Sequence, residues 1–150
     1  MRKFFVLVAA FGALVAQPAV SVAERVRTDI GRIKNVTPGG IEVIRSGQSR
    51  TANSGFRLNE GDIVVTKRNQ RVGITLADNT RLAIAPRSRV IISTYLFDRD
   101  TREGEARISL ERGRMGVDSG DLTEGERIRF RAGSSTLGVR GTHFIMEVDD

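Results

Sequence analysis

Short apolar segments with alternating side chains recur from about residue 30 onward, and they constrain the fold more than any other feature of the chain. Val, Ile, Thr and Phe occupy every second position of these segments, as in residues 72–76 and 127–131. A period of two is typical of strands that have one buried and one exposed face. Gly, Pro, Asn and Asp separate the segments and favour turns. No segment after residue 23 has the apolar repeat of an amphipathic helix.

The pattern predicts strands over residues 30–36, 41–44, 62–66, 72–76, 81–85, 90–97, 106–111, 114–117, 127–131, 136–139 and 142–148. Asp78 and Asn79 stand between two of these segments and predict a hairpin, because Asn tolerates positive φ. No long linker interrupts the series. We therefore expect one compact all-β domain of about ten short strands, either sandwich-like or a short β-solenoid.

The N-terminus has the charged, apolar and small-residue order of a secretory signal peptide. Arg2 and Lys3 precede an uncharged run over residues 4–16, and Ser21-Val22-Ala23 follows. We expect a helical signal peptide over residues 1–23, cleaved after Ala23, and a domain over residues 24–150. The protein would then be periplasmic or secreted. The alternative is an uncleaved anchor over residues 4–23, which would hold the protein at the membrane.

Composition excludes several functional classes. The chain has no Cys and one His, which rules out disulfides, thiolate metal sites and lipidated cysteines and leaves little room for a zinc enzyme or a Ser-His-Asp hydrolase. His143 is expected to be an ordinary surface residue. Asp98 and Asp100 have a spacing that Ca²⁺ could use, but the interleaved Arg99 and Arg102 favour a solvated turn. We expect no enzyme, no cofactor and no metal.

The excess of basic residues does not indicate nucleic-acid binding if the protein is exported. The net charge is +6, and loss of Arg2 and Lys3 with the signal peptide leaves +4. We expect no nucleic-acid partner. Arg127, Arg129 and Arg131 alternate with apolar residues and should share one strand face. They form either a solvated face balanced by cross-strand carboxylates or a patch for lipid phosphate or acidic glycan.

Four ordered elements over about residues 56–148 resemble the FecR domain family. They are Leu58-Asn-Glu-Gly-Asp-Ile-Val-Val-Thr66, the alternating stretch 74–90, Leu110-Glu-Arg-Gly-Arg-Met-Gly-Val117 and Leu137-Gly-Val-Arg-Gly-Thr-His-Phe-Ile-Met-Glu-Val148. The motif positions are Gly61, Asp62, Thr66, Pro86, Gly113, Arg140, Gly141, Thr142 and Phe144. Asn79 replaces the usual turn glycine, and Ala132-Gly133-Ser134 stands where the family often has Thr-Pro.

The motif residues also have physical interpretations of their own. Gly61 suits a tight turn, and Asp62 can accept backbone N–H groups. The hydroxyl of Thr66 can bond locally. Gly113 and Gly116 permit a bulge or close backbone approach beside Met115.

Arg140 stands with Gly141 and Thr142 at the start of a predicted strand. Its guanidinium could clamp a carboxylate bidentately. We favour an internal partner such as Asp62 over a carboxylate on a ligand.

The resemblance implies a periplasmic recognition or scaffold module. Better-known FecR-type regulators join a cytoplasmic anti-sigma segment to a periplasmic domain. This chain starts with the signal-peptide pattern, so we expect a stand-alone exported domain that does not itself grip a sigma factor. We expect it to bind another envelope protein through a sheet face or edge, or alternatively an anionic envelope polymer through its arginines.

Overall fold

The computed structural model describes residues 30–121, 128–138 and 143–149, which contain strands and turns but no helix. The strands are β1 (Gly31–Val36), β2 (Ile41–Arg45), β3 (Gln48–Ala52), β4 (Arg57–Leu58), β5 (Ile63–Val65), β6 (Val72–Leu76), β7 (Arg81–Ile84), β8 (Arg89–Phe97), β9 (Gly104–Asp118), β10 (Ile128–Ala132), β11 (Ser135–Gly138) and β12 (His143–Val148). The all-β prediction is confirmed. The expected signal peptide and its cleavage site lie outside the described residues, and among the residues described no helix has the length and apolar character needed to cross a bilayer.

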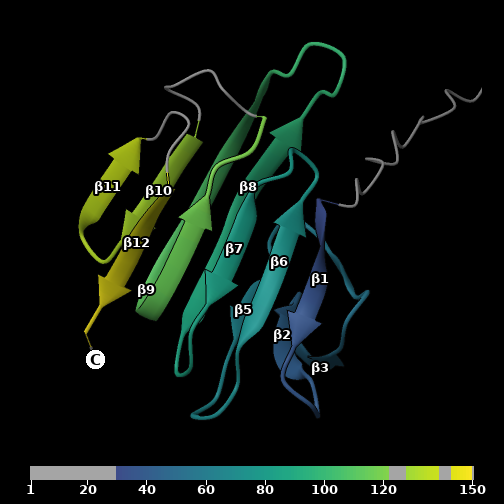
Figure 1. Cartoon of the computed structure of the whole chain (residues 1–150), viewed down its shortest axis with the longest axis vertical. Helices are drawn as coiled ribbons and strands as arrows, with labels where there is room; N and C mark the ends of the chain where they lie inside the picture. The colour runs from purple at the N-terminus through teal and green to yellow at the C-terminus, as the bar shows by residue number, and fades with distance from the viewer. Residues whose placement is uncertain (1–29, 122–127, 139–142, 150) are drawn as a thin grey trace, which may run out of the picture.

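The strands form one sheet that curls into a half-barrel around β9. The first part of β9 pairs with β8 and β10, and its last part pairs with β7 and β12. We call β12, β7, β6, β1 and β4 with the end of β9 the front half. The back half contains β8, β5, β2 and β3, with β10 and β11. Figure 1 shows the front half lying before the back half.

The pairing corrects two details of the expected fold. Every strand pair within the described residues is antiparallel except β9 with β10, whereas a β-solenoid is built from parallel neighbours. The structure is a single curled sheet rather than a solenoid or two separate sheets. It has twelve described strands, and β9 alone is 15 residues long.

A single apolar core lies between the two halves. Ile74 and Leu82 of the front half and Val64 and Ile92 of the back half are all almost fully buried. The rings of Phe130 and Phe144 meet edge to face at a centroid distance of 5.1 Å, which connects β10 to β12 inside the curl. Burial of each such side chain stabilises the fold by roughly 1.5–3 kcal/mol. The period-two pattern therefore indicates the buried faces correctly.

The expected break between residues 106–111 and 114–117 is a bend within β9. Gly113 has a φ of +85°, and a Cβ there would lie 2.7 Å from the Cα of Ser88. Glycine lets β9 leave the back half and enter the front half without a steric clash. Gly116 differs, because its Cβ would meet its nearest neighbour, the Cβ of Ala83, at an ordinary 3.8 Å. No close approach by the residues that the structure describes requires glycine there.

The β6–β7 hairpin has the predicted turn. Asn79 has a φ of +66°, and its N–H donates to the carbonyl of Leu76 over 3.1 Å. β3 and β4 were not predicted. All residues of β3 except Ala52 are exposed, so this edge strand has no apolar alternation.

Candidate functional site

Asp62 is completely buried and carries a bidentate ion pair with Arg45. Arg45 donates from Nε and Nη2 to the two carboxylate oxygens over 2.8 and 2.7 Å. The N–H of Asn59 donates to Asp62 Oδ2 over 2.8 Å, and Gly61, with a φ of +84°, supports this turn. The ion pair raises the pKa of Arg45. The carboxylate thus has its hydrogen-bond partners inside the fold.

Arg45, a residue that the sequence analysis did not single out, is thus an internal partner of Asp62. Its guanidinium also lies 5.4 Å from the centre of the Phe56 ring and donates to the carbonyl of Arg57. Arg140, Gly141 and Thr142 lie outside the described residues. Arg45 ends an alternating strand, and only the pairing of β2 with β5 places it beside Asp62.

Thr66, Ser88 and Arg114 connect the halves where the sheet bends. The hydroxyl of Thr66 donates to the carbonyl of Ala85 over 2.7 Å and accepts from the N–H of Ser88 over 2.9 Å. These partners are 19 and 22 residues away, so the bonds are not the local ones expected. Ser88 Oγ lies 3.2 Å from the carbonyl oxygens of Pro86 and Arg114, and accepts from the Arg114 N–H.

A third buried polar cluster surrounds Asp78 at the β6–β7 turn. Tyr95 donates its hydroxyl to Asp78 Oδ1 over 2.7 Å, and Thr80 donates to Oδ2 over 2.6 Å. The Gly120 N–H in turn donates to the Thr80 hydroxyl. Burial, together with the charge of Asp78, raises the pKa of Tyr95 far above its ordinary value. Asp78 and Asn79 predict the turn from the sequence, but they do not predict that Tyr95 binds Asp78 there.

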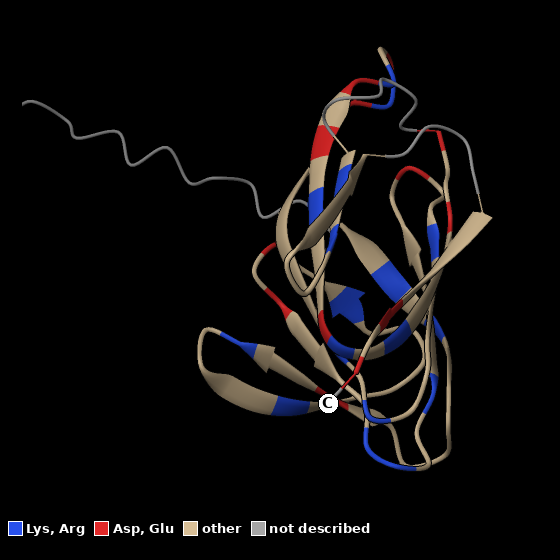
Figure 2. Cartoon of the chain, turned by 90° about the vertical axis from the view of Figure 1, so that its left-hand side faces the viewer, with Lys and Arg blue, Asp and Glu red and all other residues tan. Residues whose placement is uncertain are grey.

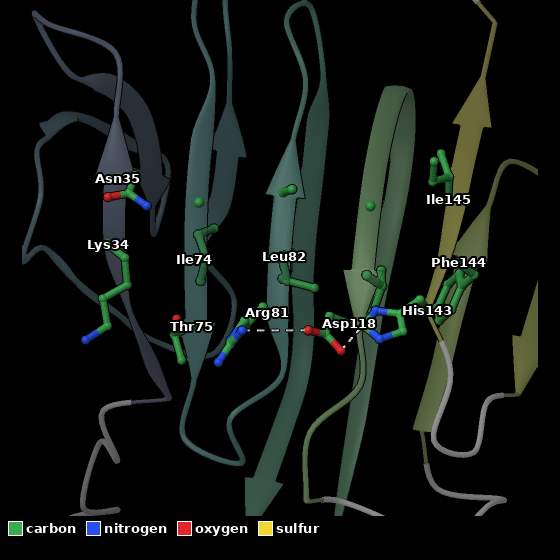
Figure 3. Close-up of a pocket in the computed structure, with 14 residues that line it drawn as sticks. Lys34, Asn35, Ile74, Thr75, Arg81, Leu82, Asp118, His143, Phe144 and Ile145 are labelled. Carbon is green, nitrogen blue, oxygen red and sulfur yellow. Dashed lines mark ion pairs between the residues drawn. The ribbon is translucent and has the colours of Figure 1, made fainter.

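The outer face of the front half carries a hollow that runs across the strands, which we call the front groove (Figure 3). Two adjoining hollows of about 550 and 650 Å³ share Asn35, Gly73 and Ala83. Strand register places Asn35, Gly73, Ala83 and Gly116 in one row across β1, β6, β7 and β9. Ile145 of β12 continues the row beside Gly116 and is 73% exposed. Very short side chains at the centre of this row form the floor of the groove.

Charged side chains form the two walls of the front groove. Arg81, Asp118 and His143 follow one another along one wall, with N–O distances of 3.9 and 3.1 Å (Figure 3). Arg114 stands on the other wall and pairs with Glu147 over 2.6 Å. Arg71 lines the same side, and Lys34 lines the β1 end. Basic side chains therefore outnumber carboxylates around the groove.

The outer face of the back half carries a second group of basic residues. Arg129 of β10 is in register with Arg107 of β9, and Arg131 is in register with Ser109. Arg107 also pairs with Glu105 over 2.7 Å, and Arg131 donates to the carbonyl of Gly133. Arg127 lies outside the described residues. Basic residues are thus spread over both halves (Figure 2), and two of the three predicted arginines share an exposed face.

A model of the family described as FecR protein matches residues 62–150, more than half of the chain. The chain belongs to the FecR family. No curated protein and no solved structure matches it.

The FecR match begins at Asp62 and includes the three later elements of the resemblance, but not Leu58 to Gly61. The described motif residues mainly stabilise turns and the bend in β9. Asp62 binds Arg45, and the backbone of Gly113 lies directly against Ser88. Phe144 packs on Phe130 inside the curl. Within the described part of this FecR domain, no group of three or more His, Cys, Asp or Glu residues could hold a metal ion.

The front groove contains no motif residue that the sequence analysis assigned to binding. One sequence signal could have located it, namely Gly73 and Gly116 in the interiors of two predicted strands. Glycine weakens a strand interior and often marks a place where another molecule approaches the backbone.

Proposed function

We propose that this protein is an exported, non-enzymatic FecR-family recognition domain that binds another envelope protein. The front groove is the observation that carries the proposal, because it offers an open surface of paired strands with charged walls. The N-terminal signal-peptide pattern supports a periplasmic or secreted location. The family match supports a role related to signalling.

The buried polar groups favour binding over catalysis. The carboxylates of Asp62 and Asp78 accept hydrogen bonds from Arg45 and Tyr95 inside the fold. Catalytic acids and bases need access to a substrate, and these groups have none. His143 is exposed and pairs with Asp118 over 3.1 Å, and Arg81 and Asp118 separate it from Thr75, the hydroxyl residue of the same row.

Export and partner binding can be tested together in the native bacterium. A C-terminally tagged full chain should be recovered from the periplasm or medium with Glu24 as its first residue, and crosslinking should join it reproducibly to a specific envelope protein. An Arg2→Glu/Lys3→Glu variant should be exported less efficiently, since the positive start of the leader is lost. Retention of the unprocessed wild-type chain in the cytoplasm would refute the proposal.

A second candidate function is binding of an anionic envelope polymer by the back half. The side-by-side arrangement of Arg107 and Arg129 favours it, because paired guanidiniums suit phosphate or carboxylate groups. Binding to vesicles containing phosphatidylglycerol should then fall steeply with salt. An Arg129→Gln/Arg131→Gln variant should bind them less. Salt-independent binding would refute this second function.

A further inference from the structure

Among the described residues, no contact explains why Gly73 and Gly116 lack a side chain. Neither residue has a positive φ, and a Cβ at either position would meet its nearest neighbour at 3.8 Å, an ordinary contact distance. Gly113, by contrast, is required by its φ of +85° and by Ser88. Because glycine destabilises the interior of a strand, two unneeded glycines in one row indicate a surface kept open for something outside the chain.

The dimensions of the front groove suit an extended chain. The walls stand two residues to each side of the floor row, so their Cα rows are about 13 Å apart at the usual strand rise. The wall side chains occupy part of that width. An α-helix with its side chains is about 10–12 Å across, whereas an extended chain needs about 5 Å. The row from β1 to β12 spans about 19 Å, enough for roughly six extended residues.

The charges of the groove favour an acidic occupant. Among the described residues, neither Lys34 nor Arg71 has an ion-pair partner. Arg81 has its side chain 74% exposed and reaches Asp118 only at 3.9 Å. These cations can pair with incoming carboxylates without first breaking a close internal ion pair.

The floor favours a polypeptide over an acidic glycan. Its centre presents only the backbone of two glycines and the methyl group of Ala83, with the exposed Ile145 at one end and the Asn35 amide at the other. Apart from this amide, these groups offer apolar contact rather than the many hydrogen bonds that sugar hydroxyls require. We infer that the front groove binds an extended acidic segment of a partner protein. The inference rests on the proposed function and specifies its site and its partner's chemistry.

Fluorescence anisotropy with a short labelled peptide of alternating Glu and Leu tests the inference directly. The full mature chain should bind this peptide more tightly than the matched peptide of alternating Gln and Leu. Gly116→Val should weaken binding by about tenfold or more, because its side chain fills the floor. Its melting temperature should be equal or higher, since valine favours strands. Ser109→Val, on the outer face of the same strand in the back half, should bind normally.

A charge exchange locates the site independently. Arg81→Glu should weaken binding of the acidic peptide, whereas Arg129→Glu, the same change on the back half, should not. Equal losses in both variants would overturn the inference, as would normal binding by Gly116→Val. Preference for an acidic oligogalacturonate over the Glu-Leu peptide would also overturn it, in favour of a glycan site.

Crosslinking in cells separates this inference from the proposed function. If the wild-type chain and Gly116→Val capture the same envelope protein equally, the groove assignment is wrong and the recognition function stands. If the acidic peptide binds as expected but no envelope protein is captured, the groove assignment stands and the proposed function fails.

Discussion

Buried polar side chains stabilise the turns of this protein through hydrogen bonds that the pairing of strands does not supply. Asp62, Thr66 and Asp78 are each almost fully buried, and each has partners from a distant part of the chain. A buried polar group without such partners would destabilise the fold by about 1–3 kcal/mol. These contacts explain why polar residues occupy positions inside an otherwise apolar core.

Loss of Arg45 should destabilise the protein strongly. Arg45→Ala leaves the Asp62 carboxylate buried without its counter-ion, so the free energy of unfolding should fall by about 3 kcal/mol. Arg89→Ala removes a partly exposed pair with Glu111 and should cost less than about 1 kcal/mol. Urea denaturation of both variants measures the difference. Equal costs would contradict the assignment of Arg45 as the clamp.

Tyr95 should make stability fall at high pH. Its pKa is raised in the fold, so its contribution is fully present below the ordinary tyrosine pKa of about 10. Above that pH the unfolded chain loses the proton while the folded chain keeps it, and the folded state is disfavoured. Tyr95 is the only tyrosine, so tyrosinate absorbance should appear together with unfolding. Tyr95→Phe should lose this component of the alkaline transition, and an unchanged transition would contradict it.

At the scale of single elements, alternation predicts those strands that bury one face. The predicted strands 72–76 and 81–85 correspond to β6 and β7 with little change. β3 escapes prediction because it pairs with one neighbour only and buries just Ala52. The long β9 was predicted as two strands, because a glycine in mid-pattern is as compatible with a turn as with a bend.

The bend in β9 should depend on Gly113 specifically. Gly113→Ala imposes a positive φ on alanine and a clash with the backbone of Ser88, so it should lower the free energy of unfolding by more than about 2 kcal/mol. Gly116→Ala, three residues along the same strand, should be neutral or stabilising by about 0.5 kcal/mol. Chemical denaturation compares them. A tolerated Gly113→Ala would show that the bend does not need glycine.

At the scale of the whole molecule, the curl gives the two halves one shared core. Leu82 of the front half and Ile92 of the back half belong to the same buried cluster, and β9 runs through both halves. Neither half can bury its apolar face without the other. The chain therefore has the organisation of one cooperative unit.

Cooperativity can be measured with one substitution in each half. Leu82→Ala and Ile92→Ala should each lower the free energy of unfolding by about 2–5 kcal/mol. Circular dichroism and the fluorescence of Tyr95 should follow the same single urea transition in both variants. Separate transitions for the two probes would show that the halves unfold independently.

Patterns along the chain predict the all-β class, the buried faces of most strands, the β6–β7 turn and the family. These properties depend on neighbouring residues and on ordered motifs, which can be identified along the chain. Three further features are visible only in the folded chain: β9 crosses both halves, Arg45 clamps Asp62, and Gly73, Ala83 and Gly116 share one row. Those facts depend on which strands pair and in what register, and pairing between distant strands is decided by the packing of the whole core.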